Sequence, residues 1–574
     1  MTIPSVLIIG AGPSGLVAAK EAKQCGFNPT VLEKDNTIGG LWKPDGKPWK
    51  GMLINNSRHA SSFSDHEWPK GAPDFPSRDD VYDYLQSYTK TFNLMEYIHI
   101  NCAVEKIEQT NNKWLVKWVK KSDEKEQRVS AIFDFVIVSS GFFSEAFIPQ
   151  ITGSETFTGS IIHSKDYKSS NEPSSLFGRI RSYPSKIYAL FQDYLLRKLQ
   201  NQKTSKLNKI FTWIASKRFI QSDPSSFKGK TIVVIGSAFS ACEIAATVAK
   251  VAKKVFNIFR RPNWITSRYL KGKDGEDNER FLPFDWTWKR SLVQSTISNE
   301  PSLPTFDRYK KINQRLHSMC NMQEKINPDL AVPVPSSDPP LTSVSDAYLP
   351  LVKKGTIIPK KCVVTKIDKD FLFLSDGNII KGVDKIIFCT GYRTRIPFFS
   401  ESIQKQLDFH PEDPLQPLPL YKTVFHPEFQ NLAFVGMSRF NIFFGPIELQ
   451  ARLATMTFSG KIPYPSKTLM EEGIHKEKKI REMNPRPQFA NLEYINFCDD
   501  LAKGIGALPD LGTLKKERPD LYKKLWNGPF TTASYRLTGF GANPTIAMKK
   551  INELYQNVGE SPFLNPECIY SSLH

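Results

Sequence analysis

A glycine-rich turn lies between a short apolar run and an alanine-rich amphipathic stretch near the start of the chain. The run Val6–Ile9 has the continuous apolar character of a strand buried on both faces of a parallel sheet. The turn that follows consists of Gly10, Ala11, Gly12, Pro13, Ser14 and Gly15. A helical pattern then extends from Leu16 to Lys23. Strand, glycine turn and helix in this order predict a dinucleotide-binding unit whose helix N-terminus faces a pyrophosphate.

An acidic residue follows the next predicted strand. Pro29–Leu32 is apolar, and Glu33 ends it about 20 residues beyond the turn, where a carboxylate accepts hydrogen bonds from a ribose hydroxyl. Such a carboxylate disfavours a 2′-phosphate, so this first site suits FAD or NAD rather than NADP. Two glycines then precede Leu41 and Trp42, which predicts a loop packed closely against a planar ligand.

A second strand, turn and helix pattern begins at Thr231–Ile235, with its glycines incomplete. Ala238 occupies the second glycine position and adds a methyl group where a pyrophosphate would approach. The next strand, Val255–Phe259, ends in Arg260 and Arg261 instead of an acid, which favours the 2′-phosphate of NADPH. The predicted cofactor contacts of this turn are Gly236, Ser237, Ser240 and Ala241.

The segment between the two turns fits the pattern F-x-G-x-x-x-H-x-x-x-Y, from Phe157 through His163 to Tyr167. With the two nucleotide turns on either side, the chain resembles the flavin-containing monooxygenases. Other stretches share the resemblance, namely Asn55–Ser57, Asp384–Tyr392, Glu448–Arg452 and Tyr535–Gly539. It implies that the 157–167 segment organises the joint between the two nucleotide domains.

The resemblance implies FAD at the first site, with Leu41 and Trp42 beside it, and NADPH at the second. Asn55 aligns with the family's active-site asparagine and is the predicted catalytic residue, with Asn56 also beside the cofactor. Arg268 is a second candidate for the 2′-phosphate. No metal is expected.

The implied fold is α/β, with two Rossmann-like dinucleotide-binding domains and the NADPH domain inserted in the FAD domain. We place the first FAD segment at 1–167, a family-atypical insert at 168–227, the NADPH domain at 228–345, and the return to the FAD domain with the C-terminal segment at 346–574.

The implied activity is an NADPH- and O2-dependent monooxygenase of the N,N-dimethylaniline monooxygenase type. It would oxygenate a soft nitrogen or sulfur atom of a small molecule through a C4a-hydroperoxyflavin. The alternative is a Baeyer–Villiger-type monooxygenase acting on ketones, although those enzymes usually carry Trp where this chain has Tyr167. A flavin disulfide reductase needs a redox cysteine pair close in sequence, and this chain has none. A docking protein with a vestigial nucleotide domain is a further alternative, suggested by Ala238 and by the net charge of +19.

The 168–227 insert has apolar residues at helical spacing, and most of its polar positions are Lys or Arg. A basic amphipathic helix pair can lie on an anionic membrane surface, or its apolar stripe can pack on the protein as a lid. The chain lacks the run of about 18 apolar residues that a spanning helix needs. Its 8 cysteines are scattered, which is typical of a reducing compartment. We therefore expect a cytoplasmic protein without a nucleic-acid partner, in contact with a membrane only peripherally, through the insert.

Overall fold

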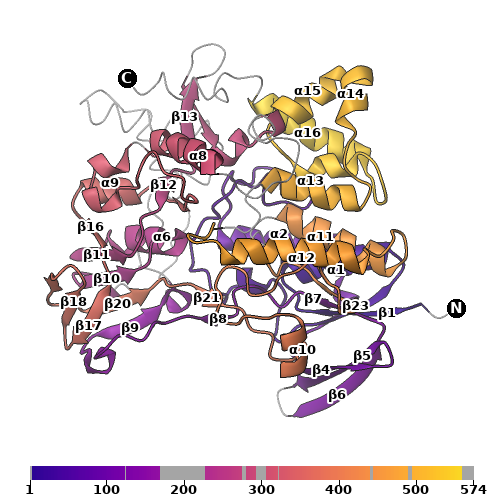
Figure 1. Cartoon of the computed structure of the whole chain (residues 1–574), viewed down its shortest axis with the longest axis horizontal. Coiled ribbons are helices and arrows are strands. Elements are labelled where there is room, and N and C mark those ends of the chain that lie inside the picture. Colours follow the sequence, from indigo (N-terminus) through magenta and orange to yellow (C-terminus); the bar gives the residue numbers. More distant parts are fainter. Residues whose placement is uncertain are drawn as a thin grey trace.

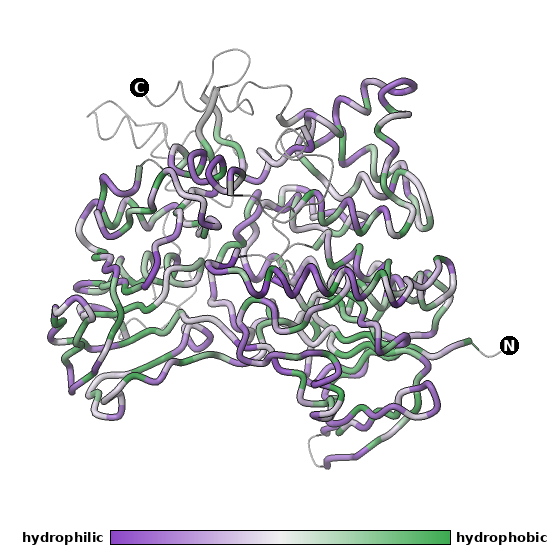
Figure 2. Tube along the Cα trace, viewed as in Figure 1, coloured by the Kyte–Doolittle hydropathy of each residue, from purple (hydrophilic) through white to green (hydrophobic). Residues whose placement is uncertain are grey.

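The computed structural model describes residues 3–122, 125–168, 226–273, 279–291, 306–320, 322–439, 444–488 and 494–558. Two sheet-and-helix units lie side by side, and a group of C-terminal helices covers one of them (Figure 1). Hydrophobic residues concentrate along the central strands, whereas outer helices such as α12 (Lys467–Glu482) are largely hydrophilic (Figure 2). The structure thus has the predicted α/β architecture.

The first sheet has six strands in the order β22-β23-β7-β1-β2-β3. Neighbours run parallel except β22, which is antiparallel to β23. The strands are β1 (Ser5–Ile9), β2 (Asn28–Leu32), β3 (Ile98–His99), β7 (Phe135–Val138), β22 (Phe425–His426) and β23 (Phe429–Phe434). Helices α1 (Pro13–Gln24) and α11 (Phe444–Phe458) pack together in the core beside this sheet. The strand and helix predicted around the first glycine turn are confirmed.

A small antiparallel sheet of β4 (Cys102–Thr110), β5 (Lys113–Lys121) and β6 (Glu126–Phe133) attaches to this unit. The fully buried Trp114 of β5 donates a hydrogen bond from Nε1 to the carbonyl of Asn431, at 3.2 Å. The contact fixes the small sheet against β23. Helix α2 (Arg78–Thr91) starts at a capping box formed by Ser77 and Asp80.

The second sheet has five parallel strands in the order β16-β11-β10-β20-β9. The strands are β9 (Ser160–His163), β10 (Thr231–Ile235), β11 (Lys254–Phe259), β16 (Ile357–Lys361) and β20 (Lys385–Phe388). Helices α6 (Phe239–Val248) and α9 (Tyr348–Lys353) pack on one side. The antiparallel strands β17 (Val364–Asp368), β18 (Phe371–Leu374) and β19 (Ile379–Ile380) pack on the other. The strands predicted at 231–235 and 255–259 are confirmed.

The sheet pairings correct the domain boundaries drawn from the sequence. β16 and β20, which we assigned to the return segment 346–574, pair with β11 and β10 of the second sheet. β9, which we assigned to the first FAD segment, pairs with β20. The chain therefore enters the second unit before residue 160 and leaves it after Phe388. Parallel strands need a long crossover connection, so strands of one sheet can be far apart in sequence. Strands β8 (Glu145–Ala146) and β21 (Tyr392–Arg393) pair where the two crossings meet.

A segment of the second unit projects towards the first. It contains the hairpin of β13 (Tyr269–Lys273) and β14 (Glu279–Pro283), followed by the short helix η6 (Phe284–Thr287). The parallel pair β12 (Trp264–Thr266) and β15 (Thr342–Val344) lies at its base, with α8 (Phe306–Met319) nearby. Helix α10 (Glu401–Gln406) belongs to the first unit.

The C-terminal part is helical and rests on α11. Its elements are α13 (Tyr494–Gly504), α14 (Leu511–Glu517), α15 (Pro519–Asn527), η10 (Thr532–Arg536) and α16 (Pro544–Val558). Among the described residues, we find no helix with the length and apolar character that crossing a membrane requires. Those residues likewise lack a group of three or more His, Cys, Asp or Glu side chains that could hold a metal ion.

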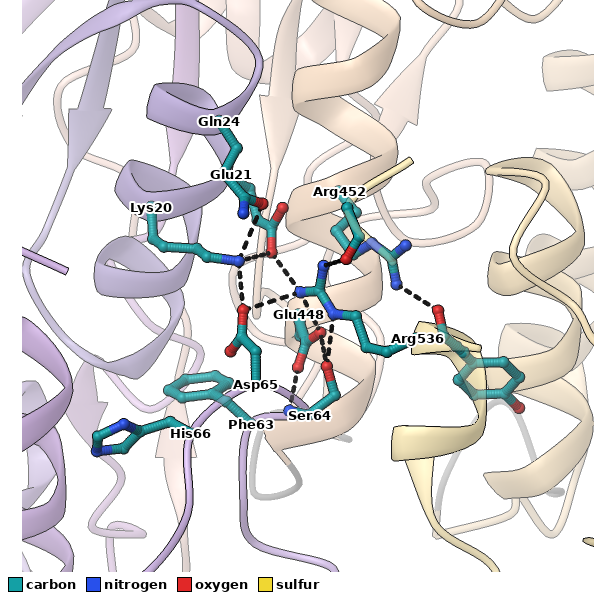
Figure 3. Close-up of polar contacts among 12 residues, drawn as sticks. Lys20, Glu21, Gln24, Phe63, Ser64, Asp65, His66, Glu448, Arg452 and Arg536 are labelled. Atoms are coloured by element: carbon teal, nitrogen blue, oxygen red, sulfur yellow. Dashed lines mark hydrogen bonds and ion pairs between the residues drawn. The ribbon is translucent and has the colours of Figure 1, made fainter. Parts of the chain in front are cut away.

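A buried charge cluster attaches this C-terminal part to α1 (Figure 3). The fully buried Arg536 donates to Glu21 and to Glu448, each at 2.7 Å. Burial raises the pKa of Glu21, but the charges of Lys20 and Arg536 outweigh it and hold that pKa at about 2. Removing one member of such a cluster leaves an uncompensated buried charge and costs about 3–5 kcal/mol.

Candidate cofactor and active site

The first glycine turn is shaped by close backbone contacts. Gly10 has φ +101°, and a Cβ built on it would lie 2.7 Å from the carbonyl oxygen of Ser139 on the neighbouring strand end. A Cβ on Gly15 would lie 1.8 Å from the carbonyl oxygen of Gly10. Helix α1 begins within the turn, at Pro13, with Gly12 as its N-cap and no side-chain cap. The first backbone N–H groups of α1 therefore face outward from the turn, as phosphate binding requires.

The two glycines before Leu41 and Trp42 lie against this turn. The N–H of Gly39 donates to the carbonyl of Ala11 at 2.9 Å. A Cβ on Gly40 would come within 3.0 Å of the Cα of Gly12. Leu41 and Trp42 follow in a short helix, η1 (Gly40–Trp42), and both are half-buried. The turn and this second loop thus form a backbone cradle that side chains would fill.

Glu33 lies beside the cradle at the end of β2. Its carboxylate is buried and accepts hydrogen bonds from the N–H of Ala11 at 2.6 Å and of Asp35 at 3.0 Å. Burial raises the pKa of Glu33, and these two donors partly offset the effect. The donor to one oxygen comes from the glycine turn itself, so the carboxylate is fixed where a ribose hydroxyl would follow the pyrophosphate. These residues fit an adenine dinucleotide without a 2′-phosphate.

The second turn repeats the geometry with fewer glycines. Gly236 has φ +135°, and a Cβ on it would lie 2.5 Å from the carbonyl oxygen of Cys389. Ala238 is the N-cap of α6, has no side-chain cap, and is exposed. Ser237 donates its hydroxyl to Asn263 at 3.1 Å, which fixes the turn against β12. Ser240 is half-buried and Ala241 is fully buried in the helix–strand contact.

The two arginines proposed for the 2′-phosphate have different surroundings. Arg260 is exposed directly after β11. Arg268 is fully buried and forms ion pairs of 3.0 Å with both Glu243 and Asp346. Burial lowers the pKa of Arg268, but the two carboxylates outweigh burial and raise it. A phosphate at Arg268 would compete with two carboxylates already in place, whereas Arg260 presents its guanidinium to solvent.

Asn55 lies on a segment that the second unit contacts on both sides. Arg268 donates to the carbonyls of Ile54, at 3.2 Å, and Leu53, at 3.4 Å. On the other side, the buried Ser57 contacts Asp285 of η6 through both its N–H and its hydroxyl. Asn55 is half-buried and Asn56 is buried. The structure therefore brings the 55–57 segment to the joint between the two nucleotide units.

The segment 157–167, with its spaced aromatic and histidine residues, lies at the same joint. His163 ends β9, is fully buried, and packs edge-on against Tyr392 with ring centroids 5.1 Å apart. Burial lowers the pKa of His163, which keeps its ring neutral. Tyr167 packs edge-on against Trp49 at 5.8 Å. These contacts connect the loop after η1 with the core of the second unit, so the segment joins the two units as the resemblance implied.

Asp285 and the cluster around Arg536 are the main features that the sequence did not reveal. Ser57 and Asp285 are 228 residues apart, and Arg536 contacts Glu21 across 515 residues. The local pairs of the cluster, such as Lys20 with Glu21 and with Gln24 on α1, do not indicate the partner on η10. One sequence provides no means to match such distant partners.

Comparison with known proteins decides the family. The family described as "Flavin-binding monooxygenase-like" matches residues 4–177 and 212–556. The chain belongs to this family. It is 28% identical over 563 residues to dimethylaniline monooxygenase [N-oxide-forming] 2 of Cavia porcellus, covering 93% of this chain and 89% of that protein. The unmatched residues 178–211 fall inside the predicted insert, most of which (169–225) lies outside the described residues.

Solved structures share the fold. S-allyl-L-cysteine S-oxygenase from Allium sativum has a TM-score of 0.57 at 20% identity, covering 97% of this chain and 99% of that one. Cyclohexanone monooxygenase from Rhodococcus sp. Phi1, solved with NADP+, has a TM-score of 0.56 at 14% identity, covering 88% and 98%. As a member of the flavin-binding monooxygenase-like family, the chain is a flavin-dependent monooxygenase, with FAD and NADPH as its cofactors and a small-molecule substrate and O2 as its reactants.

Proposed function

We propose that this monooxygenase oxygenates a soft nucleophilic nitrogen or sulfur atom of a small molecule, using NADPH and O2. The observation that carries the proposal is the joint between the two units, where Arg268 and Asp285 of the second unit contact the chain on either side of Asn55. Glu33 stands beside the first turn and Arg260 beside the second. The names of the similar proteins, an N-oxide-forming monooxygenase and an S-oxygenase, point to the same class of acceptor atom.

We assign a binding role to each predicted cofactor residue. FAD supplies the redox chemistry when bound. The turn Gly10–Gly15 would hold its pyrophosphate, Glu33 would accept from its ribose, and Leu41, Trp42 and Asn56 would lie along it. On the second turn, Gly236, Ser237, Ser240 and Ala241 would contact the NADPH pyrophosphate, and Arg260 would bind the 2′-phosphate. The ion pairs of Arg268 favour a role in fixing the joint rather than in binding phosphate.

Asn55 is our candidate catalytic residue. A carboxamide can donate and accept hydrogen bonds without consuming a proton. Placed at the joint, it would hold the reacting groups of the two cofactors and the substrate in register and exclude water from between them. We expect Asn55→Ala to retain FAD but to release most of the reducing equivalents of NADPH as hydrogen peroxide. A variant that couples NADPH use to product as well as the wild-type protein would contradict this role.

The test of the activity is a comparison of three substrates. The purified protein is reduced anaerobically with NADPH and, separately, with NADH, then mixed with O2 and a thioether, a tertiary amine or a cyclic ketone. We expect faster reduction by NADPH and oxygenated products from the thioether and the amine. Formation of an ester from the ketone, with no product from the other two substrates, would favour the Baeyer–Villiger alternative. The likeness of the fold to cyclohexanone monooxygenase is compatible with that alternative. A colourless protein that does not take up FAD would refute the proposal.

We also propose a cytoplasmic location with peripheral membrane contact through the 168–227 insert. The support is its Lys and Arg content at helical spacing and the fact that the family match omits 178–211. Sedimentation with vesicles tests it: binding to anionic vesicles and not to neutral ones is expected, and equal recovery with both would refute membrane contact.

A further inference from the structure

Asp285 binds the segment that carries Asn55. It lies in η6, and its carboxylate is buried. Oδ2 accepts the hydroxyl of Ser57 at 2.7 Å, and Oδ1 accepts the N–H of Ser57 at 3.2 Å. Ser57 lies two positions after Asn55, and both its N–H and its hydroxyl donate to the side chain of Asp285. A two-point contact fixes the orientation of the Ser57 peptide as well as its position.

The element that carries Asp285 is itself anchored on the C-terminal helices. The carbonyl of Trp288 accepts the N–H of Phe530 at 2.8 Å, and the Trp288 ring packs on Tyr494 at 5.3 Å. Arg290 donates to Asp499 at 2.8 Å and lies over the ring of Phe530. Asp285 is therefore part of a segment that is attached to the C-terminal helices.

The same element is connected to the residue on the other side of Asn55. The N–H of Phe284 donates to the carbonyl of Arg268 at 2.9 Å. Arg268 in turn donates to the carbonyls of Leu53 and Ile54. Arg268 thus contacts the chain before Asn55 and Asp285 contacts it after Asn55, and Phe284, the neighbour of Asp285, is hydrogen-bonded to the backbone of Arg268. Both Arg268 and Asp285 belong to the second unit, while Asn55 belongs to the first.

Burying a carboxylate at position 285 is energetically unfavourable. Burial of a carboxylate disfavours its charged form, and burial raises the pKa of Asp285 to about 6. The nearby carboxylate of Asp74 raises that pKa further, while the hydrogen bonds from Ser57 lower it. A side chain that only filled space at this position would gain nothing from a charge.

We propose that Asp285 is a positioning residue of the monooxygenase reaction, which orients the Asn55 amide across the joint by holding both polar groups of Ser57. The proposal rests on the proposed role of Asn55. It extends that role to the second unit, because the element that carries Asp285 follows the NADPH-binding strands in sequence. Displacement of either unit relative to the other would therefore be transmitted to the Asn55 amide.

The groups that face Asp285 come from three elements. Asp74 precedes α2 and lies 3.9 Å from Arg58, and it accepts the Tyr269 hydroxyl at 3.3 Å. His59 packs on Trp286 at 5.3 Å, and burial lowers the pKa of His59 to about 3, so its ring is neutral. Tyr494 on α13 has its pKa raised by burial and stays neutral. Burial also raises the pKa of Asp74. The pKa of Asp285, raised to about 6, is the one expected to change the charge of this set between pH 5 and pH 7.

The experiment compares Asp285→Ala, Asp285→Asn and Ser57→Ala in the FAD-loaded full chain. Asp285→Ala removes both contacts, and Ser57→Ala removes one from the opposite side. Asp285→Asn keeps both, because the amide oxygen can accept from the Ser57 N–H and the amide nitrogen can donate to the hydroxyl. Asp376→Ala, an exposed carboxylate in the turn after β18, is the matched control.

The readouts are hydrogen peroxide released per NADPH consumed, and amide exchange of the 53–58 segment. For Asp285→Ala we expect product per NADPH to fall by up to about 100-fold, since misplacement by an ångström has effects of that size. The segment should exchange faster, with FAD content and anaerobic reduction by NADPH unchanged. Ser57→Ala should show a smaller effect in the same direction, and Asp285→Asn should keep coupling but lose any pH dependence of coupling between pH 5 and pH 7.

Two results would overturn the proposal. One is wild-type exchange of residues 53–58 in Asp285→Ala, and the other is Asp285→Asn being as uncoupled as Asp285→Ala. If Asp285→Ala fails to fold, Ser57→Ala gives the same decision by the same readouts. Failure of the proposed function looks different: the wild-type protein would then give no product from any substrate, whereas the exchange measurement still reports whether Asp285 holds the segment.

Discussion

The turn at 10–15 and the turn at 236–241 reach nearly the same backbone conformation with different residues. The N-caps of the following helices have φ −75° and ψ −176° at Gly12, and φ −79° and ψ −177° at Ala238. The first glycine of each turn has positive φ and lies against the end of a neighbouring strand, where a Cβ would clash with a carbonyl oxygen. This position demands glycine in both turns, because of backbone conformation and crowding together.

The two turns differ at the second and third glycine positions of the motif. A Cβ on Gly15 would lie 1.8 Å from a carbonyl oxygen, whereas the second turn accommodates the methyl of Ala241 in a buried helix–strand contact. Gly12 lies against Gly40, while Ala238 is exposed. The comparison teaches that the glycine fingerprint combines a backbone requirement with packing requirements that depend on each unit. An alanine in the motif therefore weakens the inference of nucleotide binding less than its pattern suggests.

The largest effect should come from exchanging glycine and alanine at the third glycine position of the two turns, residues 15 and 241. Gly15→Ala forces a clash between two backbone segments, so we expect it to destabilise the first unit by roughly 3 kcal/mol or more and to abolish FAD retention. Ala241→Gly, the matched change, should cost only about 0.5–1 kcal/mol. Denaturant unfolding and the FAD absorbance of the purified variants measure both. Equal losses in the two variants would show that the turns are packed alike.

Removing the basic residue of the second turn should have the next largest effect. Arg260→Ala is expected to raise the KM for NADPH roughly 10- to 100-fold, the size of a lost charge-assisted hydrogen bond, and to leave the KM for NADH unchanged. Arg261→Ala is the control, since Arg261 donates to the carbonyl of Pro339 at 2.9 Å. Steady-state kinetics with both nucleotides give the answer. An equal rise for NADH would mean that Arg260 does not contact the 2′-phosphate.

Placing glycine at position 238, where the second turn has alanine, should test how the two turns differ in the space beside the pyrophosphate. Because Ala238 already has a φ that any residue adopts, Ala238→Gly changes only the space at the pyrophosphate. We expect NADPH to bind several-fold more tightly, about 1 kcal/mol, with no change in FAD content. Gly12→Ala is the converse variant: its Cβ would meet Gly40 at an ordinary contact distance of 3.5 Å, so it should fold and yet lose FAD affinity. Titration of reduced-nucleotide fluorescence measures the first, and FAD release the second.

The smallest effect concerns pH and only the first turn. The raised pKa of Glu33 means that the folded protein without FAD favours the protonated form, so its stability falls as pH rises above the ordinary glutamate range near 4.5. A ribose hydroxyl donates to the ionised form, so FAD affinity should rise over the same interval. Glu33→Gln should flatten both profiles. Thermal melting with and without FAD from pH 4 to pH 7 checks this, and parallel changes in the two series would contradict it.

The sequence predicted the elements that short patterns encode. The runs 6–9 and 231–235 are almost entirely apolar, and each is followed by a turn that starts with glycine and by an alanine-rich helical pattern, so both strand and helix pairs were correctly identified. Site residues adjacent to these turns, such as Glu33, follow from the same patterns.

Contacts between distant segments were not predictable. Arg268 was a candidate for the 2′-phosphate only through the family resemblance, yet Glu243 and Asp346 reach it from two other elements. The second unit recruits β9 and β20 from outside the segment that the sequence assigned to it, because parallel pairing leaves no mark in either strand. Asp285 was missed for the same reason, since nothing near residue 285 indicates that it faces Ser57.

The position of Arg536 has a consequence for how the chain is made. On the ribosome, the strands of the second unit are all synthesised by residue 388, whereas the first unit still lacks β23, α11 and the guanidinium that neutralises Glu21 and Glu448. Domains tend to fold as units during translation. Helix α1, which is synthesised early, must therefore wait for its contact with Arg536 until almost the entire polypeptide has been translated.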